Sequence, residues 1–369
     1  MKVNRSSTEP PPRTLEELAK LMGVSRATAS NAFNRPDQLS HELRQRILAV
    51  AKEVGYAGPD PTARALSRGK RGAIGLVFTE QLSYAFSDPA AVLLLEGLAE
   101  ACEQAETGLL LLPVSAGNEG SAVRAINGAA VDALALYSLP DRDPAVIAAS
   151  TRAIPAVTID QPLVPGVSYV GIDYRVAART ALSFLLGLGH RKVAVLGYRL
   201  TPERHQGAIT REHQSRAKYY STRERLIGYR EALDELGLGW DVLQFLESAS
   251  NDAAGGAASG GYLLDGPSRP TAILTDSDQL AIGVLEAAAK AGLAIPDELS
   301  VVGMDDVPAA SASSPQLTTI RQPLVEKGRR VGEILLNERV RKRNVRLPVE
   351  LIVRGSTAPP RVDARSRAR

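Results

Sequence analysis

TLEELAKLMGVSRATASNAFN, residues 14–34, decides the fold of the first part of this chain. The stretch predicts a helix, a tight turn and a second helix. Thr14 and Glu17 have the spacing of a capping box, and Ser25 is a good N-cap for the second helix. Gly23 stands at the turn, where the backbone needs a positive φ. The pattern is typical of a helix-turn-helix, whose second helix enters the major groove of DNA. A helical hairpin inside a larger core is the alternative.

Apolar residues at helical spacing continue on both sides of this turn. The first helix has one apolar face, formed by Leu15, Leu18, Ala19 and Met22. A third helix is predicted over residues 40–54, where it would close a small core. Residues 62–68 can form a short helix, which is too short to be stable alone. Residues 1–13 are polar, contain three consecutive prolines, and are interpreted as a disordered arm.

Charge is divided unevenly along the chain. Residues 1–72 hold 13 Lys and Arg against 7 Asp and Glu, whereas residues 73–369 hold 31 against 34. A basic head on a mildly acidic body suits a protein that meets phosphate groups with one end. No apolar run is long enough to span a membrane, and the N-terminus lacks the apolar segment of a signal peptide. The single cysteine, Cys102, excludes an intramolecular disulfide. The expected compartment is the cytoplasm.

From residue 73 onward, apolar runs of strand length alternate with helical patterns. The predicted strands are residues 73–78, 108–114, 133–137, 156–160, 192–198, 271–276 and 299–306. The predicted helices are residues 90–104, 120–127, 144–151, 176–186, 223–236 and 279–291. This alternation predicts βαβ units and parallel sheets. About ten strands are expected in all, which is more than a single sheet holds comfortably. We therefore expect two lobes.

Two stretches of the body depart from this alternation. Residues 201–221 are polar, rich in Arg, Lys and His, and long for a loop in a compact domain; a solvated loop is the favoured interpretation. Residues 255–262 are rich in glycine but lack the Lys-Ser/Thr of a phosphate-binding loop. They are interpreted as a helix of poor propensity, capped by Asn251 or Asp252.

Several longer segments carry a resemblance to a known family. They are GVSRATASNAFNRPDQLSHELRQRILAVAKEVGYAGPDPTARAL (23–66), IGLVF (74–78), RLIGY (225–229), ILTDSDQLAIGVL (273–285), LSVVGMDD (299–306), LTTIRQP (317–323) and LPVELIVRGST (347–357). On these segments the chain resembles the LacI/GalR family of bacterial transcription regulators over residues 14–357. The resemblance is specific because head and body motifs occur together at the right separations.

The resemblance implies an α/β fold with an all-α helix-turn-helix head. The core would have two lobes with parallel sheets and look like the periplasmic sugar-binding proteins. The implied domains are an arm (1–13), the helix-turn-helix (14–58), a hinge helix (59–71), the two-lobed core (72–357) and a tail (358–369). The implied lobes are 72–172 with 324–351, and 173–320 with 352–357. Members of the family are usually homodimers on a pseudo-palindromic double-stranded DNA operator, and a small effector changes their affinity for it.

Residues that can contact DNA lie mostly on the second helix and at its start. Arg26 can contact O6 and N7 of guanine together, with a phosphate contact as the alternative, and Ala27 can meet a thymine methyl. Asn31 replaces an Arg that is common in the family and suits adenine or phosphate. The resemblance implies that Leu66 wedges between base pairs in the minor groove; packing against the head is the alternative. The predicted set is Thr14, Ser25, Arg26, Ala27, Thr28, Ser30, Asn31, Asn34, Ala63 and Leu66.

Ligands of two-lobed α/β proteins bind beyond the carboxyl ends of the strands, in the cleft between the lobes. The predicted effector-binding residues are Thr79, Tyr84, Phe86, Tyr137, Asp160, Arg225, Ser277 and Asp305. Arg225 enters by resemblance, at the position of the Arg that usually grips effector oxygens, and Ser277 stands where several sugar-responsive members have Asn. Carboxylates and a guanidinium suit hydroxyl groups, and aromatic rings suit the apolar face of a sugar or base.

Each of these assignments has a structural alternative. Arg225 and Asp305 could form an interlobe salt bridge, Asp160 could cap the end of a strand, and the aromatic residues could belong to the core. Asp278 is interpreted as a helix N-cap rather than as a ligand contact.

Enzyme chemistry has little support in the sequence. The four histidines show no metal-ligand spacing and no paired nucleophile, and no GxSxG, HExxH or Walker motif occurs. We therefore predict a transcription regulator with no catalytic residue, metal or cofactor, most simply a repressor controlled by a sugar or nucleoside. The alternatives are a solute-binding protein of a transporter, an α/β sugar enzyme, and a regulator with a protein coeffector.

Overall fold

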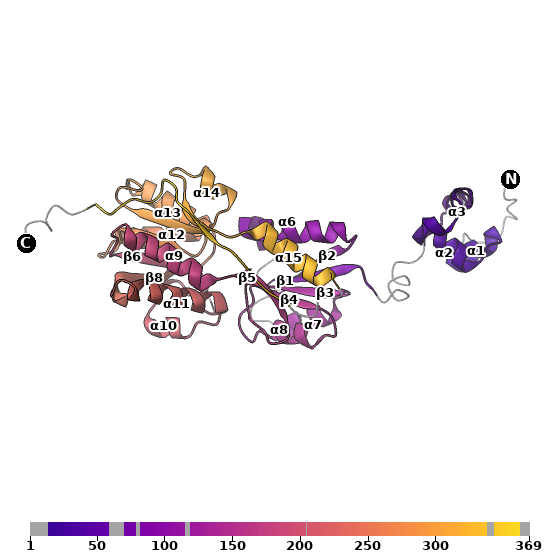
Figure 1. Ribbon diagram of the computed structural model, residues 1–369, viewed down its shortest axis with the longest axis horizontal. Coiled ribbons are helices and arrows are strands. Elements are labelled where there is room, and N and C mark those ends of the chain that lie inside the picture. The colour runs from indigo at the N-terminus through magenta and orange to yellow at the C-terminus, as the bar shows by residue number, and fades with distance from the viewer. Residues whose placement is uncertain are drawn as a thin grey trace, which may run out of the picture. The chain divides into compact units, whose positions relative to one another are not determined.

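The computed structural model describes residues 14–58, 70–78, 82–114, 119–203, 205–337 and 343–361 (Figure 1). The chain divides into two units, Met1–Gly72 and Ala73–Arg369. The division falls at residue 73, where the alternation of predicted strands and helices begins. The predicted arm, most of the predicted hinge helix and the end of the tail lie outside the described residues.

The described residues of the head form three helices. They are α1 (Leu15–Met22), α2 (Arg26–Asn34) and α3 (His41–Glu53), with a 3₁₀ turn η1 (Pro36–Gln38) between the last two. Thr14 Oγ1 accepts from the Glu17 N–H at 3.2 Å, which is the N-cap bond of the predicted capping box, and Ser25 Oγ accepts from the Thr28 N–H at 3.0 Å, as predicted. Gly23 ends α1 with φ +64, a conformation that glycine adopts without strain. The core between the helices consists of Leu18, Ala32, Ile47, Ala51 and Tyr56.

The first lobe of the body contains a six-stranded parallel sheet, ordered β12-β5-β4-β3-β1-β2. The strands are β1 (Ala73–Phe78), β2 (Gly108–Pro113), β3 (Ala133–Tyr137), β4 (Ala156–Ile159), β5 (Ser168–Ile172) and β12 (Asn344–Leu347). The helices are α5 (Tyr84–Ser87), α6 (Pro89–Gln104), α7 (Glu119–Gly128), α8 (Pro144–Thr151) and α15 (Leu324–Leu336). Helices α6 and α15 cover one face of the sheet, and α7 and α8 cover the other (Figure 1). Both faces are therefore buried, which explains the continuous apolar runs of the central strands.

The second lobe contains a seven-stranded sheet, ordered β13-β11-β10-β9-β6-β8-β7. The strands are β6 (Val193–Gly197), β7 (Gly207–Ala208), β8 (Leu243–Glu247), β9 (Ala272–Thr275), β10 (Ser300–Asp305), β11 (Thr318–Arg321) and β13 (Glu350–Ile352). The helices are α9 (Tyr174–Gly187), α10 (Arg211–Ser215), α11 (Tyr220–Asp234), the 3₁₀ turn η2 (Trp240–Val242), α12 (Ala253–Asp265), α13 (Asp278–Lys290) and α14 (Pro308–Ala312). The two edge strands are antiparallel to their neighbours, and the other pairs are parallel. The prediction of two lobes with parallel sheets is confirmed.

The described helices and strands place three passages of the chain between the lobes. The crossings follow β5, β11 and β12, because each of these strands ends in one sheet and the next element belongs to the other lobe. The predicted lobe boundary at residues 351–352 is displaced, since β13 begins at Glu350 and already pairs with β11 of the second sheet. The third crossing therefore lies at Pro348 and Val349.

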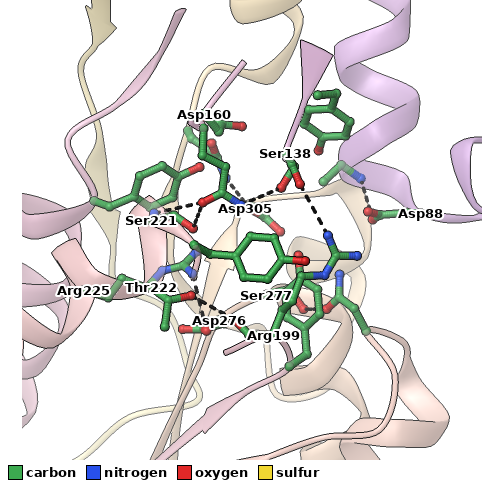
Figure 2. Close-up of a pocket in the computed structure, with 18 of the residues that line it drawn as sticks. Asp88, Ser138, Asp160, Arg199, Ser221, Thr222, Arg225, Asp276, Ser277 and Asp305 are labelled. Carbon is green, nitrogen blue, oxygen red and sulfur yellow. Dashed lines mark hydrogen bonds and ion pairs between the residues drawn. The ribbon is translucent and has the colours of Figure 1, made fainter. Parts of the chain in front are cut away.

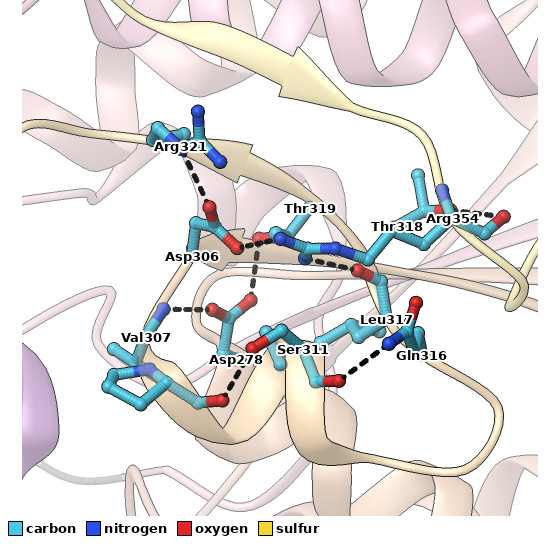
Figure 3. Close-up of polar contacts among 12 residues, drawn as sticks. Asp278, Asp306, Val307, Ser311, Gln316, Leu317, Thr318, Thr319, Arg321 and Arg354 are labelled. Atoms are coloured by element: carbon cyan, nitrogen blue, oxygen red, sulfur yellow. Dashed lines mark hydrogen bonds and ion pairs between the residues drawn. The ribbon is translucent and has the colours of Figure 1, made fainter.

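Two local interpretations of the sequence were wrong. Residues 201–221 are not one long loop: they contain β7, which extends the second sheet, and α10, which begins with a capping box between Thr210 and His213. Asp278 does not cap α13, because Ser277 does so by accepting from the Leu280 N–H at 3.3 Å. Asp278 is instead fully buried and accepts from the Val307 N–H at 2.9 Å and from the Thr319 hydroxyl at 2.6 Å (Figure 3).

The glycine-rich segment 255–262 lies within α12, as predicted, and Asp252 caps it. Its composition follows from close packing against α13. A Cβ built on Gly256 would lie 2.3 Å from the Leu280 carbonyl oxygen, so a larger side chain would push the two helices apart. Tertiary contact thus compensates for poor helix propensity.

Candidate functional site

Helix α2 of the head has one buried and one exposed side. Ala29 and Ala32 are fully buried, whereas Arg26 and Ala27 are exposed. These two exposed residues belong to the first turn, the part of a recognition helix that reaches base edges. The Ser25 cap fixes where the helix begins, so the backbone at Arg26 has a defined position.

The other predicted contacts on α2 are half-buried and hydrogen-bonded within the head. Thr28 Oγ1 lies 2.8 Å from the hydroxyl of the capping serine. Asn34 Nδ2 donates to Ser30 Oγ, and Asn31 Nδ2 donates to Gln38 Oε1, both at 3.2 Å. Such bonds restrict the rotamers of polar side chains and so prepare them to contact phosphates or bases. Ala63, Leu66 and Thr79 lie outside the described residues, and their roles stay predictions.

A polar pocket lies between the two lobes of the body (Figure 2). Its empty space is about 610 Å³ with the open mouth included. It is lined by Asp88, Ala90, Tyr137, Ser138, Asp160, Gln161, Tyr174, Tyr198, Arg199, Tyr219, Ser221, Thr222, Arg225, Asn251, Asp276, Ser277, Asp305, Gln322 and Leu324. Many of these residues directly follow parallel strands, which is where ligands bind in such sheets.

Most of the predicted effector residues meet in this pocket. The ones that line it are Tyr137, Asp160, Arg225, Ser277 and Asp305. Tyr84 lies beside it, and its hydroxyl accepts from Asn251 Nδ2 at 2.9 Å. Phe86 is 66% exposed and does not line the pocket. The short helix α5 directs Ala85 inward and leaves Phe86 in solvent, so this prediction is corrected.

Several lining residues were missed although the strand-end rule could have found them. Tyr198 is the last residue of the predicted strand 192–198, and Arg199 follows it. Asp276 ends the predicted strand 271–276, and Gln161 follows Asp160 at the end of the strand 156–160. Others, such as Asp88 and Gln322, come from a helix cap and an interlobe crossing. Their place in the pocket depends on how the lobes pack, and no local pattern in the sequence marks it.

Arg225 and Asp276 form the central ion pair of the pocket. Arg225 Nη1 lies 3.4 Å from Asp276 Oδ2, and the two side chains are only 12% and 10% exposed. The guanidinium also stacks over Tyr174 at 4.8 Å from the ring centre. Burial opposes the charge on Arg225, but Asp276 and the nearby tyrosines outweigh it, and the pKa of Arg225 is raised. Its Nε is buried and has no hydrogen-bond partner among the described residues.

Three carboxyl groups of the pocket bind protons more readily than ordinary aspartates. Burial raises the pKa of Asp88 and of Asp276, in the second case against the opposing effect of Arg225. The pKa of Asp305 is raised well above its usual range by burial, and then by the charges of Asp278 and Asp88. Groups of this kind can accept hydrogen bonds from hydroxyls or donate to them.

Direct hydrogen bonds connect the two lobes across the pocket. Gln161 of the first lobe accepts from the Ser221 N–H at 2.9 Å and from its hydroxyl at 2.8 Å, and donates to Ser138 Oγ at 3.0 Å. Nearby, the Asp141 N–H donates to the Lys218 carbonyl oxygen at 2.9 Å. The pocket therefore lies at the contact between the two lobes, and a ligand bound in it can change how the lobes pack against each other.

Comparison with known proteins accounts for both units. Residues 14–58 match the model for bacterial regulatory proteins of the lacI family, and residues 182–357 match a periplasmic binding protein-like domain. An HTH-type transcriptional regulator of Mycobacterium tuberculosis is 41% identical over 95% of this chain and 99% of its own length. The chain belongs to the LacI family of bacterial transcriptional regulators.

Solved structures of LacI-family proteins agree with this assignment. A LacI-family regulator from Corynebacterium glutamicum is 36% identical, with a TM-score of 0.71 over 94% of this chain and 98% of that one. The regulator CelR, in complex with cellobiose, is 27% identical, with a TM-score of 0.66 over 94% of this chain and all of that one. Family proteins are DNA-binding regulators with a small-molecule domain and are not enzymes, which confirms the regulator prediction over those of an enzyme or a solute-binding protein.

Within the described ranges of this LacI-family chain, no three His, Cys, Asp or Glu side chains are placed to hold a metal ion. No helix among the described residues is long and apolar enough to cross a membrane.

Proposed function

We propose that this LacI-family regulator is a repressor whose operator affinity is set by a neutral polyhydroxy effector, a sugar or nucleoside, bound between the lobes. It acts in the cytoplasm as a homodimer on a pseudo-palindromic operator. The effector contacts Tyr137, Asp160, Arg225 and Asp305, and Ser277 supports the site from the start of α13.

The observation that carries the proposal is the balance of groups in the pocket. Both acceptors and donors line it, among them the four aspartates Asp88, Asp160, Asp276 and Asp305 and the two arginines Arg199 and Arg225. Each arginine already faces a carboxylate, a carbonyl oxygen or aromatic rings. An anionic ligand would meet an excess of carboxyl groups, whereas a neutral polyol can both donate and accept.

Aromatic rings support the same class of ligand. Tyr137, Tyr174, Tyr198 and Tyr219 all line the pocket, and rings of this kind cover the apolar face of a sugar or base. The cellobiose complex of CelR shows that a relative with this fold takes a carbohydrate, which supports the proposed class.

The test is a thermal-shift screen of the full chain with pentoses, hexoses, disaccharides and nucleosides. A ligand at about 100 times its Kd stabilises the fold by roughly 2.7 kcal/mol. We expect at least one hit, and we expect it to weaken by about ten- to a hundredfold in Arg225→Lys, because a hydrogen bond to a charged group is lost. Phe86→Ser is the matched control, since this exposed residue lies outside the pocket.

Two results would contradict the proposal. A hit that Arg225→Lys and Asp305→Asn leave unchanged would place the effector elsewhere. No shift with any polyol, together with tight operator binding, would indicate a protein coeffector or an effector-independent regulator.

A further inference from the structure

Lys327 of α15 is a fully buried lysine, with 0% of its side chain exposed. It lies on the helix face that also buries Leu324, Val331 and Leu335. A charged side chain is stable in such a position only when it is paired and hydrogen-bonded. The partners of Lys327 therefore explain why a lysine occupies a core position.

The Lys327 ammonium has two hydrogen-bond acceptors. Nζ donates to Asp160 Oδ1 at 2.7 Å and to Gln322 Oε1 at 2.6 Å. Because Lys327 holds the carbonyl side of the Gln322 amide, the amide nitrogen faces the other way and donates to Asp305 Oδ1. One ammonium thus fixes Asp160 directly and Asp305 through one side chain.

These partners connect the two lobes. Asp160 follows β4 of the first sheet, Asp305 ends β10 of the second, and Gln322 lies on the crossing that leads from β11 to α15. All three line the pocket, whereas Lys327 lies behind them and does not.

The backbone at both aspartates is strained. Asp160 has φ +64 and Asp305 has φ +116, values that side-chain-bearing residues rarely adopt and that persist only where surrounding contacts hold them. The hydrogen bonds to Lys327 and Gln322 are such contacts, and they hold each carboxyl at the pocket wall.

We propose that Lys327 is a positioning residue for effector binding: it orients the carboxyl groups of both lobes and ties the lobes together behind the ligand. The proposal deepens the proposed function, because it concerns the same pocket. When the link is cut, the lobes open more often and the effector meets carboxyl groups that are no longer held in place.

The test of the tie between the lobes needs no ligand. The amides of Asp141 and Ser221 donate across the lobes, so their hydrogen exchange reports opening of the pocket. We compare the full-length wild type with Lys327→Met, which removes the ammonium, and with Gln322→Met, which cuts the link to Asp305 and leaves the Lys327–Asp160 pair. Val331→Ala is the control, since it weakens the same helix in the core without touching the network.

We expect exchange at both amides to rise about ten- to a hundredfold in Lys327→Met and Gln322→Met, as for the loss of a hydrogen bond to a charged group. Val331→Ala should leave exchange at these amides near the wild-type rate. Exchange in both methionine variants no faster than in Val331→Ala would overturn the proposal. If Lys327→Met does not fold, Gln322→Met decides the outcome alone.

A second readout separates this proposal from the proposed function. D-Glucose, D-ribose and cellobiose are titrated into the wild type and into Gln322→Met. A sugar that binds the wild type should bind the variant at least about tenfold more weakly, and equal affinity would overturn the positioning role. If none of the three binds the wild type, the support for the proposed effector class falls, while the exchange measurement still decides whether Lys327 ties the lobes.

Discussion

Removing the Arg225 guanidinium should destabilise the body of the protein through the carboxylate that it leaves behind. In Arg225→Met, Asp276 stays buried with no counter-ion among the described residues. At the observed 3.4 Å between the charged atoms, an effective dielectric of about 20 gives an attraction of roughly 5 kcal/mol. Breaking a buried pair from one side costs about 3–5 kcal/mol, so a fall in melting temperature of roughly 5–15 °C is expected.

The pH dependence of this loss identifies its cause. Burial raises the pKa of Asp276 even beside Arg225, and removing Arg225 raises it further. A carboxyl group whose pKa is higher in the folded state stabilises the fold below its unfolded pKa of about 3.9, and this contribution disappears as the pH rises through the folded value. The melting temperature of Arg225→Met should therefore lie closer to wild type at pH 5 than at pH 8.

The assay is thermal unfolding of the wild type, Arg225→Met, Asp276→Asn and the double variant at both pH values. The double variant leaves no unpaired charge, so it should recover more than half of the loss at pH 8. An equal loss at pH 5 and pH 8, without recovery in the double variant, would refute the view that an unpaired carboxylate causes it.

Three other changes have defined outcomes. Burial raises the pKa of Asp278 to about 7, so its contribution to the free energy of unfolding falls as the pH rises from about 4 to 7. Asp278→Asn keeps an acceptor for the Val307 N–H (Figure 3). In urea titrations this variant should show a weaker dependence of the free energy of unfolding on pH. Arg26→Ala should weaken operator binding by the roughly 1–3 kcal/mol of a bidentate base contact and leave binding to random DNA nearly unchanged in anisotropy titrations. Leu66→Ala should weaken operator binding and reduce DNA bending in gel-shift assays while leaving the melting curve unchanged; an unchanged bend would remove the wedge role.

The head and the order of the lobes could be predicted because local signals determine them. The caps at Thr14 and Ser25 and the glycine at residue 23 are all local features. Among the strands that the periodicity missed, β5 (SYVGI) and β8 (LQFLE) are short and mix polar with apolar residues. Their strand conformation depends on their neighbours in the sheet, as β5 lies between β4 and β12.

The pocket could be predicted only in part, for a similar reason. Residues at strand ends, such as Asp160 and Asp305, follow from the topology of parallel sheets. Phe86 also follows a strand in the sequence, but it lies on a single turn of helix. The sequence does not indicate which side of this turn faces the pocket. Lys327 would be assigned to the solvent by any polarity argument, and its burial depends on Asp160, 167 residues away in the chain.

The most direct test of the central claim measures operator affinity as a function of the effector. Fluorescence anisotropy of an operator selected from random DNA is titrated with full-length protein, with and without the polyol that the thermal screen identifies, for the wild type and for Arg225→Lys. A pocket that controls the head predicts at least a fivefold change in operator Kd in the wild type, within the usual range of allosteric coupling of about 1–3 kcal/mol, and a much smaller change in the variant. An identical operator Kd with saturating and with no polyol, for a ligand that demonstrably occupies the pocket, would contradict it.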